Sequence, residues 1–428
     1  MAFNTLRSVD LFERVNRCCV VSAGEPPPFT LILGSGFSYG IIPTTAQIVR
    51  EDLPWWLWCQ RKEKGGPTPD DYRNRKEADF ATQAKDESRT FWSRVSATYA
   101  SGSRSPLALG ADGLPEGEAI GEAYRFALSA GCGSGLSSPH QVRRYFGDII
   151  RRIGRRLNPA HLFLASLIAE RPRLFGTIFT TNFDPLLQRS LQLVNAPYYV
   201  SDRPDTMQHA DDDDIAEAVH VVHAHGSIYR YLLVNSPAEI ESYATRNRDK
   251  LQEYFRSHAV LIVGFSGWDD AITRALAGVD QFAHNLYWTD RGTDPEKSNL
   301  TVQAKEILKR HHNAFYVPIG SADELMAQMH QHLLGHSLPK LFREPILVAQ
   351  GQLDLCDLTG VKLPASTTPP TPTASDGSAR TASAAGSADQ LDLGEQVKAV
   401  RKRLDDAQDL FTGRTSTDPA ALLAAEVR

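Results

Sequence analysis

The sequence predicts an α/β protein whose mainly parallel sheet carries helices on both faces. Short apolar runs of strand length recur along the chain, at 29–33, 174–181, 219–223, 259–263, 286–289 and 315–319. Runs that are apolar throughout are typical of strands buried on both faces of a parallel sheet. Helical stretches separate several of them, and such alternation indicates parallel order. We therefore predict a Rossmann-like sheet together with a mostly helical insertion.

Composition limits the class of protein. Of the 428 residues, 42% are hydrophobic, which is enough for a sizeable core. The 46 Lys and Arg against 51 Asp and Glu give a formal net charge of −5. This mildly acidic balance argues against a protein whose whole surface binds nucleic acid. The chain has no run of about 18 apolar residues, so no membrane-spanning helix is expected, and its first twenty residues lack the pattern of a secretory signal.

The five cysteines are scattered and odd in number, and none belongs to a Cys-x-x-Cys pair. This usage fits the reducing cytosol and argues against an ordinary four-cysteine zinc site. We therefore expect a cytoplasmic protein that holds no metal.

Four segments are expected along the chain. Residues 1–28 contain a helix with apolar side chains at helical spacing, followed by a proline-rich stretch. Residues 29–345 form the main domain, with the helical insertion at about 55–157. Residues 364–390 are rich in Ser, Thr, Ala and Pro, which predicts a flexible linker. Residues 391–412 carry apolar side chains at alternating steps of four and three, which predicts an amphipathic, coiled-coil-like helix.

Polar or glycine-rich motifs follow four of the predicted strands. They are Gly34-Ser35-Gly36-Phe37-Ser38, Thr181-Asn182-Phe183-Asp184, His223-Ala224-His225-Gly226-Ser227 and Gly264-Phe265-Ser266-Gly267-Trp268-Asp269-Asp270. The carboxyl ends of parallel strands are where open α/β sheets bind ligands. All four motifs therefore fall at the kind of place where a binding site is expected.

Each motif also has a structural interpretation. The glycines of the first allow backbone N–H groups to approach a phosphate, but they serve a tight turn equally well. Asn182 or Asp184 can cap the helix that follows the second motif, and Asp269 can cap the helix after the fourth. At most one of the two histidines is expected to face a site, and His225, next to Gly226 at the end of the strand, is the better candidate. No third metal ligand with plausible spacing accompanies this pair.

In this order the motifs resemble those of the sirtuin family. Residues 34–38 with Ile42-Pro43 resemble its Gly-Ala-Gly-Ile-Ser and Ile-Pro signature, and Asn158-Pro159-Ala160-His161 resembles the helix before its second motif. Residues 181–184 are similar to Gln-Asn-Ile-Asp, His225-Gly226 to the catalytic His-Gly, and residues 264–266 to a later Gly-Thr-Ser loop. The resemblance spans roughly residues 29–334.

The resemblance implies a domain that binds NAD as its substrate and breaks the nicotinamide–ribose bond. Asn182 would position the ribose and the attacking water, and His225 would accept a proton, a role that suits an imidazole near neutral pH. The other residues implied to bind NAD are Gly34, Ser35, Gly36, Phe37, Ser38, Asp184, Gly264 and Ser266. Among these, Asp184 would contact the nicotinamide amide.

Two departures separate the chain from sirtuin deacylases. It lacks their four-cysteine zinc module, and Thr44-Thr45-Ala46 replaces the Asp-Phe-Arg that follows Ile-Pro. The motif spellings resemble instead a bacterial sirtuin-like group that hydrolyses NAD, often in anti-phage defence. We expect an NAD glycohydrolase that yields nicotinamide and ADP-ribose without a metal.

Other functions and the partners stay open at this point. The pocket could sense a nucleotide or act as a scaffold without turnover. A helix with arginines at 143, 144, 151, 152, 155 and 156 could follow nucleic-acid phosphates, although a solvated face with acidic partners is the commoner explanation. The resemblance implies a homo-oligomer or a partner such as a HerA-type ring ATPase, and no membrane. The 391–412 helix either docks onto such a partner or folds back onto its own domain.

Overall fold

A computed structural model describes residues 3–18, 29–61, 78–100, 105–128, 138–201, 218–227, 232–233, 237–268, 270–354 and 398–406. The chain divides into two compact units, Met1–Pro339 and Lys340–Arg428. The expected linker at 364–390 lies outside the described residues. Of the expected tail helix, residues 398–406 are described, and they are helical.

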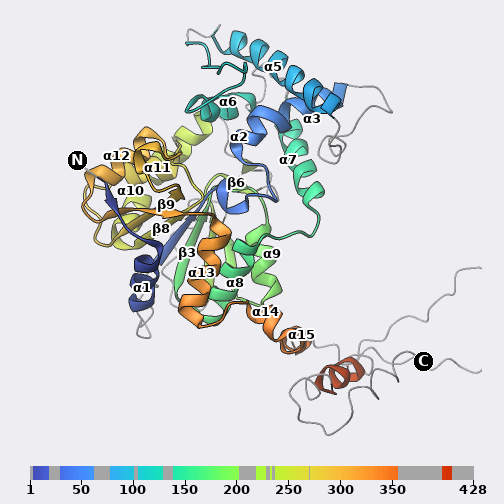
Figure 1. The fold of residues 1–428 in the computed structure, drawn as a ribbon, viewed down its shortest axis with the longest axis vertical. Helices are drawn as coiled ribbons and strands as arrows, with labels where there is room; N and C mark the ends of the chain where they lie inside the picture. The colour runs from blue at the N-terminus through green and yellow to red at the C-terminus, as the bar shows by residue number, and fades with distance from the viewer. Residues whose placement is uncertain are drawn as a thin grey trace, which may run out of the picture. The chain divides into compact units, whose positions relative to one another are not determined.

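An eight-stranded sheet forms the centre of the first unit, and every pairing between its described strands is parallel (Figure 1). The strand order is β1-β10-β9-β8-β2-β3-β5-β4. The strands are β1 (Asn4–Thr5), β2 (Phe29–Leu33), β3 (Phe175–Thr180), β4 (Tyr198–Ser201), β5 (Val219–His223), β8 (Ala259–Val263), β9 (Leu286–Arg291) and β10 (Ala314–Ile319). The predicted fold class is confirmed, because all six predicted runs are strands of this sheet.

Helices cover both faces of the sheet because successive strand side chains point to opposite sides. On β8, Leu261 and Val263 belong to one apolar cluster, whereas Val260 and Ile262 belong to another. The first cluster is covered by α1 (Ser8–Cys18), α8 (Pro159–Glu170), α9 (Leu186–Leu193) and α13 (Ala322–Leu334). The second is covered by α10 (Pro237–Ser257), α11 (Ala271–Ala277) and α12 (Val302–Arg310).

The described part of the N-terminal segment belongs to the same unit as the sheet. Strand β1 pairs with β10, and the N–H of Leu6 donates to the carbonyl of Tyr316 at 2.9 Å. On α1, Leu11, Phe12 and Val15 are buried in the first cluster. Residues 3–18 therefore complete one edge of the sheet and part of its core.

The insertion is mostly helical where it is described, and residues 105–118 form turns with a short bridge between Leu109 and Pro115. It contains α3 (Leu53–Arg61), α5 (Ala78–Ala100), α6 (Ala119–Leu128) and α7 (Pro139–Ile153), preceded by α2 (Thr45–Gln47) and a π-helical turn (Ile48–Asp52). These elements pack around a third apolar cluster that is rich in aromatic side chains. Within it the indole N–H of Trp92 donates to the carbonyl of Val49 at 2.8 Å, so this buried donor is satisfied inside the insertion.

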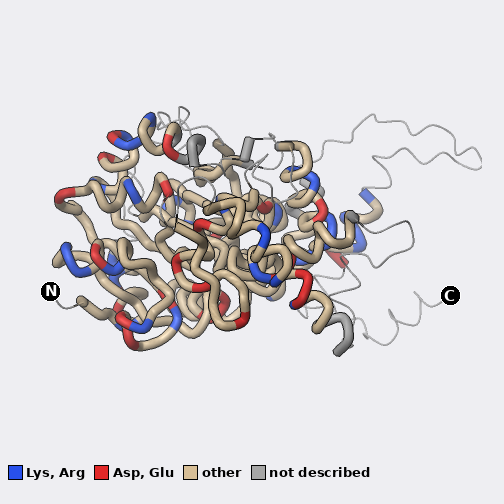
Figure 2. Tube along the Cα trace, turned by 90° about the horizontal axis from the view of Figure 1, so that it is seen from above, with Lys and Arg blue, Asp and Glu red and all other residues tan. Residues whose placement is uncertain are grey.

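The arginine-rich stretch at 143–156 falls on α7 and just beyond it. Arg152 forms a buried ion pair with Asp52, at 3.1 Å, and Arg151 pairs with Asp148 at 3.2 Å. The guanidinium of Arg156 donates to backbone carbonyls near the end of the helix. Basic and acidic positions are interspersed along the trace (Figure 2). These contacts favour a structural role for Arg151, Arg152 and Arg156.

The second unit contributes short helices and no part of the sheet among its described residues. These are α14 (Lys340–Arg343), α15 (Pro345–Asp354) and the helix at 398–406. The amide of Gln350 donates to Asp405 and joins two of them. None of the described helices combines the length and apolar character that crossing a bilayer requires.

Candidate active site

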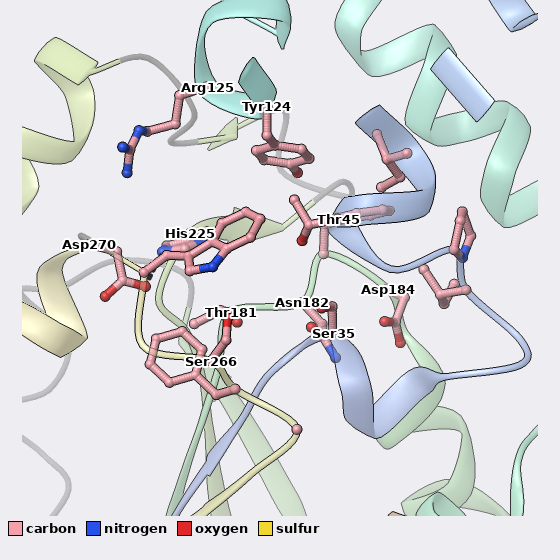
Figure 3. A pocket seen from close by; sticks show the side chains of 17 residues that line it. Ser35, Thr45, Tyr124, Arg125, Thr181, Asn182, Asp184, His225, Ser266 and Asp270 are labelled. Atoms are coloured by element: carbon pink, nitrogen blue, oxygen red, sulfur yellow. Dashed lines mark ion pairs between the residues drawn. The ribbon is translucent and has the colours of Figure 1, made fainter. Parts of the chain in front are cut away.

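A cavity of about 90 Å³ lies where β2, β3, β5 and β8 end (Figure 3). All four predicted motifs contribute to its wall. They supply Ser35, Thr181, Asn182, Phe183, Asp184, His225, Gly264, Phe265, Ser266, Trp268 and Asp270. The remaining wall comes from the segment around α2 and from α6, with Ile42, Pro43, Thr45, Ile48, Tyr124 and Arg125.

Asn182, Ser38 and Asp184 form one buried hydrogen-bonded chain beside this cavity. The amide of Asn182 donates to the carbonyl of Gly34 at 3.0 Å and to Ser38 Oγ at 3.1 Å. Ser38 Oγ in turn donates to Asp184 Oδ2 at 3.0 Å. Ser38 is fully buried and does not line the cavity. Its hydroxyl therefore holds the two lining residues in place.

Asp184 has both a structural and a site-facing role. Its Oδ1 accepts the N–H of Leu186 at 3.0 Å, which caps α9 as one interpretation of the motif predicted. Burial raises the pKa of Asp184 to about 6, and the hydrogen bonds from Leu186 and Ser38 act in the opposite direction. A carboxyl group with this pKa is present in both protonation states near neutral pH, so it can accept or donate a hydrogen bond.

The glycines of the first and fourth motifs let two loops approach each other. A Cβ on Gly34 would lie 2.4 Å from the carbonyl oxygen of Gly264, and one on Gly36 would lie 2.9 Å from its Cα. Gly264 has φ +68°, and a Cβ there would lie 2.3 Å from the nitrogen of Phe37. The space that the absent side chains leave is thus filled by the facing loop.

The backbone N–H groups of this first loop are largely committed. Gly34, Gly36 and Phe37 donate to the carbonyls of Val263, Gly264 and Gly34, at 3.0, 2.9 and 2.9 Å. Each of these three N–H groups already has a backbone acceptor, whereas the predicted approach of this loop to a phosphate stays a prediction. Ser35 is the residue of this loop that lines the cavity.

Phe37 packs the first loop against α8, the helix before β3. Phe37 is fully buried and packs edge-on against His161, with ring centroids 4.7 Å apart, so it is a core residue and not part of the cavity wall. The amide of Asn158 donates to the carbonyl of Phe37 at 2.7 Å, and Asn158 also bonds His161. Burial lowers the pKa of His161 to about 3, so its ring is neutral.

The two histidines have different surroundings because β5 ends at His223, whereas His225 lies beyond the strand, beside Gly226. His225 lines the cavity, and its Nε2 lies 3.1 Å from Asp270 Oδ2. His223 is buried outside the cavity wall, where its Nδ1 lies 3.0 Å from the carbonyl oxygen of Asn182 and its Nε2 contacts the amide of Gln188. His223 therefore contacts the backbone of Asn182 and does not face the cavity.

Sequence reasoning missed several residues of this wall. Asp270, and not Asp269, caps α11, since its Oδ1 accepts the N–H of Thr273 at 2.8 Å. Tyr124 and Arg125 reach the cavity from α6 of the insertion, and no motif or periodicity marks them. Burial raises the pKa of Tyr124, so its phenol stays protonated. Among the described residues no group of three or more His, Cys, Asp or Glu side chains converges as a metal site requires.

The parallel sheet and the position of the cavity define a Rossmann-type α/β protein with its site at the strand ends. Residues 176–311 match the family model of the SIR2-like domain. This part of the chain is therefore SIR2-like, as its motifs predict, and the domain supports an NAD-utilising role.

Three solved structures are similar to this chain. Two are mutants of a Sir2 homologue in complex with ADP-ribose, with 15% and 14% identity and TM-scores of 0.35 and 0.34; each comparison covers 76% of this chain and 96% of the other. The third is described as the structural basis for the mechanism and regulation of Sir2 enzymes, with 11% identity, a TM-score of 0.29 and coverage of 76% and 98%. No curated protein matches the chain.

Proposed function

We propose that this chain is an NAD glycohydrolase that converts NAD and water into nicotinamide, ADP-ribose and a proton. The observation that carries the proposal is the convergence of Asn182, Asp184 and His225 on one cavity within a SIR2-like domain. Three polar groups of different chemistry thus face the same space from adjacent strand ends. The family resemblance of each motif supports the same reaction.

Asn182 is suited to orient the ribose and the attacking water. Its amide nitrogen donates to the carbonyl of Gly34, which can only accept, and to Ser38 Oγ. These bonds use both amide hydrogens and leave Oδ1 as the atom that can accept from a ribose hydroxyl or a water. An oriented carbonyl dipole also stabilises the positive charge that develops on the ribose as the bond to nicotinamide breaks.

His225 is suited to take the proton. Water attacks the anomeric carbon of the ribose, nicotinamide leaves as a neutral molecule, and one proton of the water must be removed. An imidazole at the edge of the cavity accepts that proton as a general base, a contribution of typically about 10²–10⁴ in rate. Asp184 would meet the carboxamide of the nicotinamide, where its pKa of about 6 allows either direction of hydrogen bonding.

The biological setting is part of the proposal. By its resemblance to bacterial sirtuin-like NADases, the chain would act as an anti-phage effector that an assembly or a partner protein restrains. A free NADase would exhaust the NAD of its own cell, so such restraint is expected. The tail is the candidate docking element, because its described helix at 398–406 lies outside the sheet-containing unit.

Truncation tests the docking role of the tail. A chain that ends at Lys362 should assemble less than the full chain when its mass is measured by light scattering, alone and with a co-expressed ring ATPase from the same genomic neighbourhood. Unchanged assembly would show that the tail does not dock.

The function itself is tested by incubating the purified chain with NAD and separating the products by chromatography. Equal amounts of nicotinamide and ADP-ribose support the proposal. A chain that binds NAD and leaves it intact would instead be a nucleotide sensor.

A further inference from the structure

Asp270 caps α11 and also contacts His225, the candidate general base. Its Oδ1 accepts the N–H of Thr273 at 2.8 Å, and its Oδ2 lies 3.1 Å from His225 Nε2 (Figure 3). The side chain of Asp270 is 7% exposed, and that of His225 is 24% exposed. The two oxygens of one buried carboxylate thus serve two different elements, the first turn of α11 and the end of β5.

The contact with Asp270 determines which ring nitrogen of His225 carries the hydrogen. His225 Nε2 is buried and has no well-aligned hydrogen-bond partner, although it lies within ion-pair distance of Asp270. A buried ring nitrogen next to a carboxylate is most stable when it carries the hydrogen, because a lone pair facing the carboxylate would be repelled. The preferred tautomer therefore has its hydrogen on Nε2 and its lone pair on Nδ1.

The cap fixes the carboxylate in turn. Thr273 N–H and Asp270 Oδ1 are buried, and α11 belongs to the second apolar cluster through Ile272, Ala275 and Leu276. Asp270 therefore cannot rotate away from His225 without loss of the first hydrogen bond of a packed helix. The position of the carboxylate is set by the fold.

We propose that Asp270 is the positioning residue that fixes the tautomer and the orientation of His225, so that Nδ1 accepts the proton of the attacking water. This inference rests on the proposed NAD cleavage and adds to it a second residue, held by the helix cap. The same logic operates wherever a carboxylate orients a catalytic imidazole: the carboxylate stays ionised and stabilises the imidazolium that forms.

Asp270→Asn is the decisive variant because it keeps the acceptor for Thr273 N–H and replaces the oxygen that faces His225 by a hydrogen-bond donor. Thr273 N–H requires an acceptor, so the oxygen of the asparagine stays at the cap and its NH₂ group faces His225. That NH₂ group donates to Nε2, which moves the hydrogen of the imidazole to Nδ1. Asp270→Ser also keeps a cap, since serine and asparagine cap equally well, but it places no donor against the ring.

We expect Asp270→Asn to lower kcat for NAD cleavage by roughly 100-fold or more with KM within about threefold of the parent. Asp270→Ser should lose less activity than Asp270→Asn, although asparagine is the closer match in shape. A purely structural role would produce the opposite ranking. Asp294→Asn is the matched control, because Asp294 caps another turn through Glu296 N–H and is far more exposed; its kcat should equal that of the parent.

Nuclear magnetic resonance of ¹⁵N-histidine-labelled protein reads the tautomer without any turnover. The His225 signal, assigned by its loss in His225→Ala, should show the hydrogen on Nε2 in the parent and on Nδ1 in Asp270→Asn. An unchanged tautomer together with parental kcat in Asp270→Asn would overturn the inference while NAD cleavage stands. Absence of NAD cleavage from the parent, with the tautomer change present, would instead overturn the proposed function and retain the contact.

Discussion

Ser38 Oγ donates a 3.0 Å hydrogen bond to Asp184 Oδ2, and the same oxygen accepts the amide of Asn182 at 3.1 Å. One buried hydroxyl from the segment after β2 thus connects Asn182 and Asp184 of the motif after β3. Because Asn182 also donates to the carbonyl of Gly34, the ends of these two neighbouring strands are joined twice. The geometry of the candidate site therefore depends on a residue that does not face the cavity.

Replacement of Ser38 by alanine should weaken both stability and cleavage. It leaves the Asp184 carboxyl and the Asn182 amide each short of a buried partner, which costs about 1–3 kcal/mol in the free energy of unfolding. Urea unfolding and the rate of nicotinamide release measure the two effects. Ser190→Ala is the control, since Ser190 is also fully buried but bonds only carbonyls of its own helix. Equal losses in both variants would contradict a special role for Ser38.

Replacement of Asp184 by asparagine should reveal the raised pKa of this carboxyl. The folded-state pKa of about 6 lies above the ordinary carboxyl value of 3.8, so the stabilisation tied to the protonated form is complete below about pH 4 and is lost as pH rises through 6. Asparagine cannot ionise and escapes this loss. Relative to the parent, Asp184→Asn should therefore gain about 2 kcal/mol in unfolding free energy between pH 4 and pH 7.5, at about 1.4 kcal/mol per pKa unit.

Urea unfolding of both proteins at the two pH values measures this gain. Ionisation of other groups cancels in the comparison, because the variants differ at one position. A difference in stability that is the same at pH 4 and pH 7.5 would show that burial does not raise the pKa of Asp184.

Alanine variants of His225 and His223 should differ, because the first loses the general base and the second loses a structural contact. His225→Ala removes the general base and should abolish NAD cleavage with little change in unfolding free energy, because the ring is partly exposed at the cavity. His223→Ala removes a buried contact to the carbonyl of Asn182, so it should cost about 1–3 kcal/mol in stability yet keep measurable cleavage. Thermal unfolding and product chromatography distinguish them. Loss of all cleavage in His223→Ala, with His225→Ala active, would reverse the assignment.

Gly264 should tolerate alanine far less than another glycine with positive φ. At Gly264 an added Cβ meets the backbone of the facing loop at 2.3 Å, so the strand-end loops must separate. At Gly335, with φ +73°, an added Cβ meets nothing within 4 Å, and the cost is the left-handed backbone alone, about 1 kcal/mol. We expect Gly264→Ala to lose several times that stability in urea unfolding. Similar losses in the two variants would show that the loops do not touch.

The sheet and the grouping of the motifs could be predicted because both follow from local pattern. Strands buried on both faces read as apolar runs, and parallel order brings their carboxyl ends to one edge. β4 was missed because the run Tyr198-Tyr199-Val200 is short, and on this edge strand its side chains are partly or fully exposed. β1 is two residues long and carries no pattern at all.

The rest of the site depends on packing between distant segments. Tyr124 and Arg125 reach the cavity because the insertion folds around its own aromatic core, which no local spacing reveals. The role of the first glycines also needed the structure, since a glycine that frees an N–H for a ligand and one that admits a neighbouring loop look identical in sequence. Here the N–H groups of Gly34, Gly36 and Phe37 already have backbone acceptors, which favours the second role.

The central claim is that the cavity beside Asn182 breaks the nicotinamide–ribose bond of NAD. Its most direct test is incubation of the purified full-length chain with NAD, over a range of protein concentrations, with nicotinamide and ADP-ribose quantified beside a matched Asn182→Ala sample. The account predicts equal amounts of both products from the parent and none from the variant, whose fold is confirmed by circular dichroism. Equal release by the two proteins, or none by the parent at any concentration, would contradict it.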